Sequence, residues 1–207
     1  MLRTYNMKLN PSKCAFRVTV RKFLGFMVSQ RGIEVNLEKV RDIMELAPPK
    51  TVKEVQSLNG KIVALNRFVS RAMDKCLPFF HTLKKSFEWM DECQQAFKNL
   101  KVYLSSPPLL SPSRPREELY LYLAISQAAI SAAFIREKDG CHRPIYFTSR
   151  AFRGVEERYP QMEKLAFALV IAARKLKPYF QAHTIVGLTE KPLRRVMNSP
   201  EIVGQMA

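Results

Sequence analysis

Lysine and arginine are the most frequent side chains of this sequence that can take part in chemistry. The 207 residues include 34 Lys and Arg against 18 Asp and Glu, which gives a formal net charge of +16 and a pI near 9.9. This excess indicates a polyanionic partner, although a solvated basic surface would have the same composition. Basic residues recur along the whole chain, so the charge does not belong to a single basic tail.

Clusters of these basic residues could contact the phosphates of a nucleic acid. Such contacts supply affinity without a preference for particular bases. Aromatic residues stand near several clusters and could stack on bases, but most aromatic side chains belong to a core. The last cluster could equally solvate a short surface helix. The clusters are Arg21-Lys22, Lys84-Lys85, Arg174-Lys175-Lys177 and Arg194-Arg195, and the nearby aromatic residues are Tyr5, Phe23, Tyr179 and Phe180.

The cysteines predict neither a zinc site nor a disulfide framework. Cys14, Cys76, Cys93 and Cys141 lie far apart, without a Cys-x-x-Cys pair and without a His at metal-ligand spacing. We expect reduced, mostly buried thiols. No apolar run approaches the roughly 18 to 20 residues of a membrane span, and the basic start lacks an apolar signal core. The sequence therefore predicts an intracellular protein, cytoplasmic or nuclear, without a membrane partner.

The first half of the chain is predicted to form short strands followed by helices. Gln30-Arg31-Gly32 is a turn between β-branched and aromatic runs, which favours a small antiparallel unit. Asn36 can cap the first helix, and Thr51 with Glu54 has the spacing of a capping box for the second. The expected strands are Cys14 to Val20, Lys22 to Ser29 and Ile33 to Val35.

The expected helices carry apolar residues along one face. The first runs to about Leu46 with Leu37, Val40, Ile43 and Met44 on that face, and the second carries Val52, Val55, Leu58, Ile62 and Leu65. The third covers Lys75 to Lys85, and Asp91 opens the fourth, with Gln94 in the box position and Phe97, Leu100 and Leu104 on its face.

A proline-rich stretch marks the best domain boundary. Four of the thirteen prolines lie between Ser105 and Pro115, where they exclude a helix or an inner strand. The order strand, strand, strand, helix, strand follows, and the fourth strand can lie parallel to the first. These strands are Leu119 to Ile125, Ala129 to Glu137, Pro144 to Ser149 and Thr184 to Leu188; the helix runs from Pro160 to about Leu176, where Pro178 ends it, and a short helix is expected over Pro192 to Met197.

Several motifs are specific in combination, although each is weak alone. They are Asn10 to Phe16 (NPSKCAF) with Phe23 to Ser29 (FLGFMVS), Thr51 to Leu58 (TVKEVQSL) with Asn66-Arg67-Phe68, Phe87-Glu88-Trp89 with Cys93, Pro144 to Ala151 (PIYFTSRA), and Glu157 to Ala166 (ERYPQMEKLA). Together they resemble the polyproteins of long-terminal-repeat retrotransposons of the Ty3/gypsy type, particularly the plant members.

The resemblance implies an α/β or α+β fragment of a polyprotein, adjoining upstream domains if the native chain is longer. Residues 1–35 would be the end of the reverse-transcriptase palm with a primer-grip-like hairpin, and residues 36–104 the helical thumb and connection. Residues 105–118 would be a linker, and residues 119–207 a partial RNase H-like domain, a mixed sheet truncated at its C-terminus. The nucleic-acid-binding residues would then be Phe23, Leu24, Gly25, Arg174, Lys175, Arg194 and Arg195.

The resemblance also implies a nuclease site that uses two magnesium ions. In this family an Asp on the first strand, a Glu on the first helix and an Asp after the fourth strand hold the ions, which activate water and stabilise the leaving oxygen. The helix residue falls on Glu163, whereas the first-strand Asp falls on Ala124 and the last Asp on Glu190. One shared ligand is therefore a methyl group, and another has an arm longer by one methylene.

The fragment is accordingly expected to bind an RNA–DNA hybrid or duplex without cutting it. Glu163 and Glu190 would be remnant carboxylates, and no Mg²⁺ would be bound productively. The alternative is an active or weakly active magnesium-dependent RNase H. Glu163 also has a structural interpretation, because an acidic residue in the first turn of a helix interacts favourably with the helix dipole. Polymerase activity is not expected, since the family's Tyr-x-Asp-Asp motif is absent from the sequence.

Overall fold

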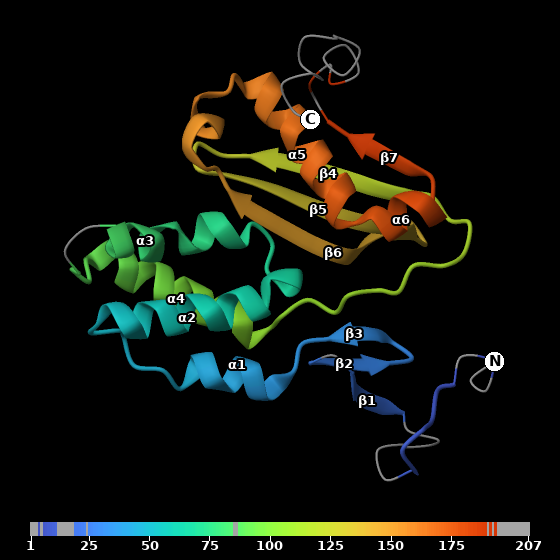
Figure 1. The fold of residues 1–207 in the computed structure, drawn as a ribbon, viewed down its shortest axis with the longest axis horizontal. Coiled ribbons are helices and arrows are strands. Elements are labelled where there is room, and N and C mark those ends of the chain that lie inside the picture. The colour runs from blue at the N-terminus through green and yellow to red at the C-terminus, as the bar shows by residue number, and fades with distance from the viewer. Residues whose placement is uncertain are drawn as a thin grey trace.

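The computed structural model describes residues 4, 6–11, 19–23, 25–84, 87–189, 191 and 193. A small sheet and a group of helices form one half of the molecule, and a four-stranded sheet with two helices forms the other (Figure 1). The elements are β1 (Val20–Phe23), β2 (Phe26–Ser29), β3 (Gly32–Glu34), α1 (Leu37–Met44), α2 (Val52–Ala64), η3 (Asn66–Phe68), α3 (Ala72–Lys84), α4 (Asp91–Ser105), β4 (Leu119–Ile125), β5 (Ala129–Lys138), β6 (Cys141–Ala151), η4 (Gly154–Arg158), α5 (Gln161–Lys175), α6 (Lys177–Ala182) and β7 (Ile185–Leu188).

The small sheet has the order β1-β2-β3, and both pairings are antiparallel. One continuous strand over Lys22 to Ser29 was predicted, and this prediction is wrong. Gly25 has a φ of +81°, a left-handed conformation that favours glycine, so the chain reverses there and forms a hairpin. Most of the predicted strand Cys14 to Val20 lies outside the described residues, as do Leu24 and the predicted helix after Lys191 except Leu193.

The helices α1 to α4 enclose the larger apolar core, and their N-caps follow the predicted chemistry. The Asn36 side chain accepts a hydrogen bond from the backbone of Glu38 (3.0 Å), and Thr51 accepts one from Glu54 (3.2 Å). The Glu54 carboxylate binds the backbone N–H of Lys50 (2.6 Å) instead of that of Thr51, so the capping box is shifted by one residue.

Three details of the predicted helices are wrong. Leu37 and Met44 are 67% and 38% exposed, because the buried stripe of α1 consists of Val40 and Ile43 alone. The third helix begins at Ala72, before the predicted Lys75. Gln94 does not cap α4, since its side chain accepts a hydrogen bond from the Trp89 indole (2.9 Å).

The larger sheet has the order β6-β5-β4-β7, in which β7 lies parallel to β4 as predicted. The strand β6 begins at Cys141, earlier than the predicted Pro144. Proline is tolerated at this position because β6 is an edge strand with a register shift opposite Phe134 and Ile135. The long helix α5 ends at Lys175, close to the predicted Leu176. Pro178 does not stop the helical structure as predicted, because it lies in the first turn of α6, where its missing N–H costs little.

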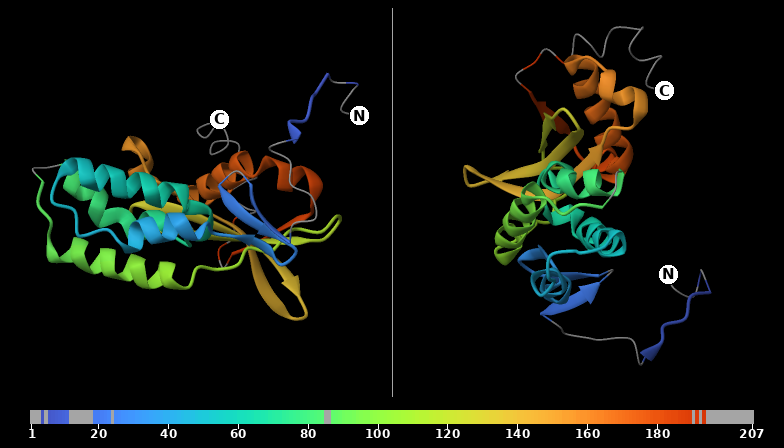
Figure 2. Two further views of the ribbon diagram at one scale, coloured as in Figure 1. Left: turned by 90° about the horizontal axis from the view of Figure 1, so that it is seen from below. Right: turned by 90° about the vertical axis from the view of Figure 1, so that its left-hand side faces the viewer.

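Helices cover the larger sheet on both faces (Figure 2). On one face, Leu119, Leu121 and Phe134 pack with Ala172 and Leu176 at the end of α5. On the other face the cover is α3 and η3. There the Ser149 hydroxyl accepts a hydrogen bond from the backbone N–H of Met73 (3.1 Å) and also bonds the hydroxyl of Ser131 (3.0 Å).

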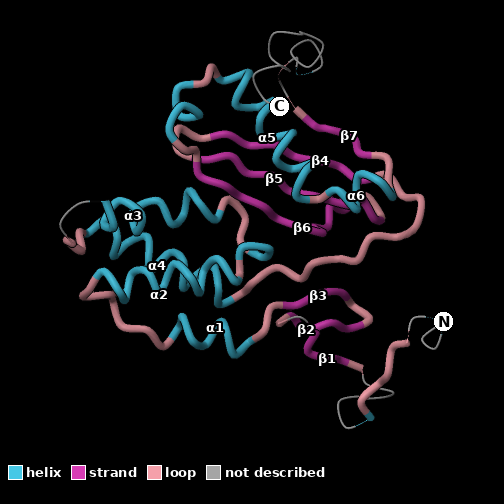
Figure 3. Tube along the Cα trace, viewed as in Figure 1, coloured by secondary structure: helices cyan, strands magenta, loops and turns pink. Residues whose placement is uncertain are grey.

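The proline-rich segment crosses between the two sheets before it enters β4 (Figure 3). Leu110 exchanges two backbone hydrogen bonds with Ile33 of β3 (2.8 and 3.0 Å), and Ser111 donates to the carbonyl of Pro144 on β6 (2.7 Å). Near the end of the segment, Glu117 forms an ion pair of 2.7 Å with Arg136 of β5. The side chain of Glu117 is 17% exposed and that of Arg136 is 7% exposed. The segment is thus bonded to both sheets.

This ion pair gives a prediction about stability. Glu117→Gln removes the charge but keeps the shape, and it leaves the buried Arg136 guanidinium without a counter-charge. We expect the free energy of unfolding in urea to fall by about 2 kcal/mol. The matched control is Asp139→Asn, which acts on an exposed pair of 3.9 Å with Lys138 and should cost less than about 0.5 kcal/mol. Equal effects of both changes would contradict the structural role of Glu117.

Candidate functional site

The strand β4, the helix α5 and the strand β7 converge at the carboxyl ends of the two strands (Figure 1). An open depression of about 480 Å³ lies there. Its lining is mainly apolar, with two hydroxyl groups and one cation. The lining residues are Tyr122, Leu123, Ile125, Leu165, Leu188, Thr189 and Lys191.

The predicted site residues occupy these converging elements. Ala124 lies near the end of β4, where it pairs with Ser131 of β5, and Glu163 lies in the first turn of α5. Glu190 lies outside the described residues. By the alternation of a strand, Ala124 shares a face with Tyr120 and Tyr122, since the intervening leucines pack against α5. Within the described ranges, no group of three or more His, Cys, Asp or Glu could hold a metal ion.

Two lysine ammonium groups bond to residues that precede Glu163 in the sequence. The Lys191 ammonium donates to the Gln161 side chain (2.6 Å), and the Lys164 ammonium donates to the carbonyl of Glu157 (2.8 Å). A magnesium pair needs several anionic oxygens close together. Of the two described positions, Glu163 supplies one carboxylate and Ala124 supplies only a methyl group. These two side chains do not fit that metal pair.

One acidic residue from a distant part of the sequence does reach the end of β4. The Asp74 carboxylate of α3 accepts a hydrogen bond from the Ser126 hydroxyl (2.6 Å) and another from the Arg71 guanidinium (2.9 Å). The Ser126 oxygen in turn accepts from the backbone N–H groups of Ala128 and Ala129 (3.2 and 3.0 Å). Asp74 is therefore engaged in holding the turn after β4. No local sequence signal indicates this contact, because 52 residues separate the partners.

The predicted nucleic-acid-binding residues fall on two separate surfaces. Phe23 is 61% exposed at the end of β1, and the Lys39 ammonium would lie 2.9 Å from a Cβ placed on Gly25. Arg174 and Lys175 are exposed in the last turn of α5, where partial burial of the amine lowers the pKa of Lys175. The small sheet and α5 lie at opposite ends of the molecule (Figures 1 and 2). Arg194 and Arg195 lie outside the described residues.

The aromatic residues near the second surface belong to the core. Tyr179 and Phe180 pack against Phe134, with ring centroids 5.8 and 5.5 Å from it. Aromatic side chains more often belong to a core than to a binding surface, and these two follow that rule. The exposed groups at this surface are therefore the basic side chains Arg174 and Lys175.

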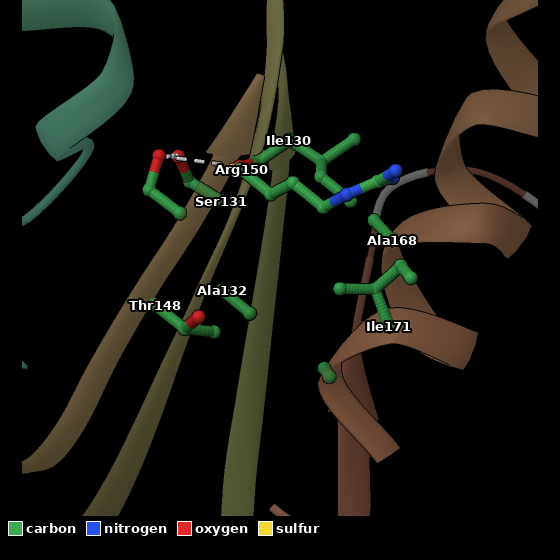
Figure 4. A pocket seen from close by; sticks show the side chains of 9 residues that line it. Ile130, Ser131, Ala132, Thr148, Arg150, Ala168 and Ile171 are labelled. Carbon is green, nitrogen blue, oxygen red and sulfur yellow. Dashed lines mark hydrogen bonds between the residues drawn. The ribbon is translucent and has the colours of Figure 1, made fainter. Parts of the chain in front are cut away.

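A smaller cavity between β5, β6 and α5 is not a ligand site (Figure 4). Its free volume is about 10 Å³, enough for about one water molecule. The Arg150 side chain at its edge is already engaged, since it donates to the Glu156 carboxylate (2.8 Å) and lies 5.1 Å from the centre of the Phe167 ring.

Comparison with known proteins finds a family model that is similar to the later part of the chain. Residues 89–186 match the family described as the RNase H-like domain found in reverse transcriptase. This part of the chain is therefore similar to that family in sequence. The match covers the last helix before the proline-rich segment, the four-stranded sheet through the first residues of β7, and both helices on one face.

The surrounding sequence is related to retrotransposon polyproteins. The chain is 29% identical to the retrovirus-related Pol polyprotein from transposon 412 of Drosophila melanogaster. The alignment spans 194 residues and covers 92% of this chain. It is 23% identical over 208 residues to the transposon Tf2-3 polyprotein of Schizosaccharomyces pombe. The aligned region is only 16% and 15% of the length of these two relatives.

Solved structures share the fold. The foamy viral protease-reverse transcriptase in complex with an RNA/DNA hybrid has a TM-score of 0.70 at 21% identity, covering 92% of this chain and 26% of that one. The same enzyme in complex with dsDNA has a TM-score of 0.69 at 20% identity, covering 91% and 40%. The predicted fold class, a small antiparallel sheet with helices followed by a mixed sheet, is confirmed. In the described part of the chain, no helix is long and apolar enough to cross a bilayer.

The contact between β4 and α3 can be tested by a double-mutant cycle. Ser126→Ala removes the hydroxyl that two backbone amides and Asp74 share, and we expect a loss of about 1 to 3 kcal/mol in the free energy of unfolding. Asp74→Ala should cost a similar amount, and the double variant clearly less than the sum. Asp42→Ala serves as control, because its pair with Lys61 is longer (3.5 Å) and more exposed. Strict additivity of the first two changes would rule out the coupling.

Proposed function

We propose that this chain binds duplex nucleic acid, an RNA–DNA hybrid in the first place, and does not cleave it. The observation that carries the proposal is the methyl group of Ala124 at the strand end where the family pattern has a shared metal ligand. The net charge of +16 favours a polyanionic partner, and the foamy viral enzyme of the same fold is seen with an RNA/DNA hybrid and with dsDNA.

The loss of cleavage follows from the electrostatics of two-metal catalysis. Two cations about 4 Å apart repel each other, and only several anionic ligands can hold them together. With alanine at position 124, the described site keeps one of these carboxylates, Glu163, and carries a lysine ammonium near the same helix turn. A cation there would find fewer anionic ligands, whereas the phosphates of a bound duplex would still find basic side chains.

The type of retroelement and the division of the chain into parts belong to the same proposal. We infer that the chain derives from a Ty3/gypsy-type element, with palm, thumb and RNase H-like parts divided near residues 35, 104 and 118, and that upstream polyprotein domains and an intracellular setting go with it. The motifs from Asn10 to Phe16 and from Thr51 to Leu58 support this assignment. The alternative function is a magnesium-dependent RNase H, for which the position of Glu163 in the first turn of α5 is the favouring observation.

Binding can be tested with a fluorescent RNA–DNA hybrid in a polarisation titration. Arg174→Glu with Lys175→Glu should weaken binding by at least about tenfold near 100 mM salt, and should lower the slope of log K against log salt by about 2. Lys53→Glu with Lys98→Glu makes the same charge change at exposed positions of α2 and α4 and is the matched control. Equal losses in both variants would show that only the net charge matters, not the end of α5.

Cleavage can be tested by rebuilding the missing ligand. Ala124→Asp with Glu190→Asp is expected to produce magnesium-dependent cleavage of the hybrid, because it restores the carboxylates that the family pattern requires. The unmodified chain should show none, and Glu163→Gln in the restored background should abolish the gain. If the unmodified chain cuts the hybrid in magnesium and Glu163→Ala removes that activity, the alternative is correct and the proposal of an inactive site fails.

A further inference from the structure

Three aromatic side chains form a continuous surface on the face of the larger sheet that is opposite α5. Tyr120 and Tyr122 stand on β4, and His142 stands on β6. The His142 ring stacks on Tyr120 with ring centroids 5.9 Å apart, and it meets Tyr122 edge-on at 5.8 Å. His142 Nδ1 and the Tyr122 hydroxyl lie 3.2 Å apart, within hydrogen-bond distance. We call these three residues the aromatic platform.

The platform is open to solvent. Tyr122 is 38% exposed, and His142 is exposed as well. The helices α3 and η3 cover the same face of the sheet, but the hydrogen bonds of α3 reach it at Ser126 and Ser149, toward the other end of the strands. The rings are therefore accessible to a binding partner.

The charges that border the platform are negative, in contrast to the rest of the chain. Glu137 is the cross-strand partner of His142. The carboxylates of Glu137 and then Glu118 lie close enough to Tyr120 to raise the pKa of its hydroxyl. The basic neighbours Lys138 and Arg143 alternate to the opposite side of their strands, and Lys138 pairs there with Asp139. The platform thus combines aromatic faces with carboxylates.

This combination fits a cation better than a phosphate. A guanidinium group can stack on an aromatic face and at the same time bind a carboxylate with its N–H groups. The chain already contains such stacking, since the Arg67 guanidinium lies 4.7 Å from the centre of the Tyr146 ring and 5.6 Å from that of Phe26. A nucleic-acid strand stacked on the same rings would bring its phosphates toward Glu118 and Glu137, which would repel them.

We propose that the aromatic platform, bordered by Glu118 and Glu137, is a docking surface for an arginine-rich segment of a partner protein. This surface is distinct from the basic surfaces assigned above to nucleic acid. It lies on the sheet face away from α5, so both kinds of partner could bind at once.

The test uses the full chain and a fluorescein-labelled dodecapeptide of alternating arginine and glycine, titrated at about 150 mM salt, where repulsion by the distant positive charges is screened. Glu137→Gln and Tyr122→Leu together should weaken peptide binding by about tenfold, and Tyr122→Phe, which keeps the ring, should leave it within about twofold. Asp139→Asn is the matched control, because it removes one negative charge from the same hairpin outside the platform.

A single-stranded DNA 12-mer is titrated against the same variants. Its binding should be unchanged or stronger in the Glu137→Gln variant, because a repelling carboxylate is removed. Weaker oligonucleotide binding in the Tyr122→Leu variant, with peptide binding unaffected, would overturn the proposal in favour of a base-stacking surface. Equal peptide binding by all variants, with unchanged far-UV circular dichroism, would also overturn it. Neither result bears on hybrid binding at the end of α5, which has its own variants.

Discussion

The structure depends on the requirement that both faces of the larger sheet be covered. One face is apolar, and the aliphatic side chains of β4, β5 and β6 pack on α5 through ordinary hydrophobic burial. The other face carries hydroxyl groups, Ser131 and Ser149 among them, which must keep hydrogen-bond partners when helices cover them. The backbone of Met73 and the carboxylate of Asp74 supply such partners, so α3 is fixed to this sheet by specific polar contacts.

A second set of contacts joins the small sheet to the same body. The Arg67 guanidinium, just after α2, lies between Phe26 of β2 and Tyr146 of β6, and thereby connects both sheets. The proline-rich segment adds backbone hydrogen bonds to Ile33 on one side and to Pro144 on the other. The exposed Phe23 at the end of β1 and the basic end of α5 are therefore held at a fixed separation. A ligand that touched both would have to extend along the molecule, as a duplex does.

Local patterns predicted the elements better than they predicted the contacts between them. Apolar alternation gave β4, β5 and the parallel β7, and capping residues such as Asn36 and Thr51 marked helix starts, because both signals act over a few residues. The exposure of Leu37 could not be predicted, since its periodic position does not reveal which residues the tertiary packing reaches. The contact of Asp74 in α3 with Ser126 after β4 was also missed, because tertiary packing alone brings these distant residues together. The positions of Ala124 and Glu163 followed from family resemblance, and the structure adds the neighbours that surround them.

Those neighbours show that the packing around the candidate site rests on apolar burial. In a two-metal site the carboxylates repel one another, and the bound cations offset that repulsion. Ala124 adds no such repulsion at the end of β4, and the residues of β4 that pack on α5 are its leucines and Ile125. The depression beside them is lined by Leu123, Ile125 and Leu165, whose burial needs no metal, and the Lys191 ammonium bonds to Gln161 at the first turn of α5. This packing stabilises the domain by apolar burial whether or not the site cleaves nucleic acid, and the basic side chains at the other end of α5 lie outside it.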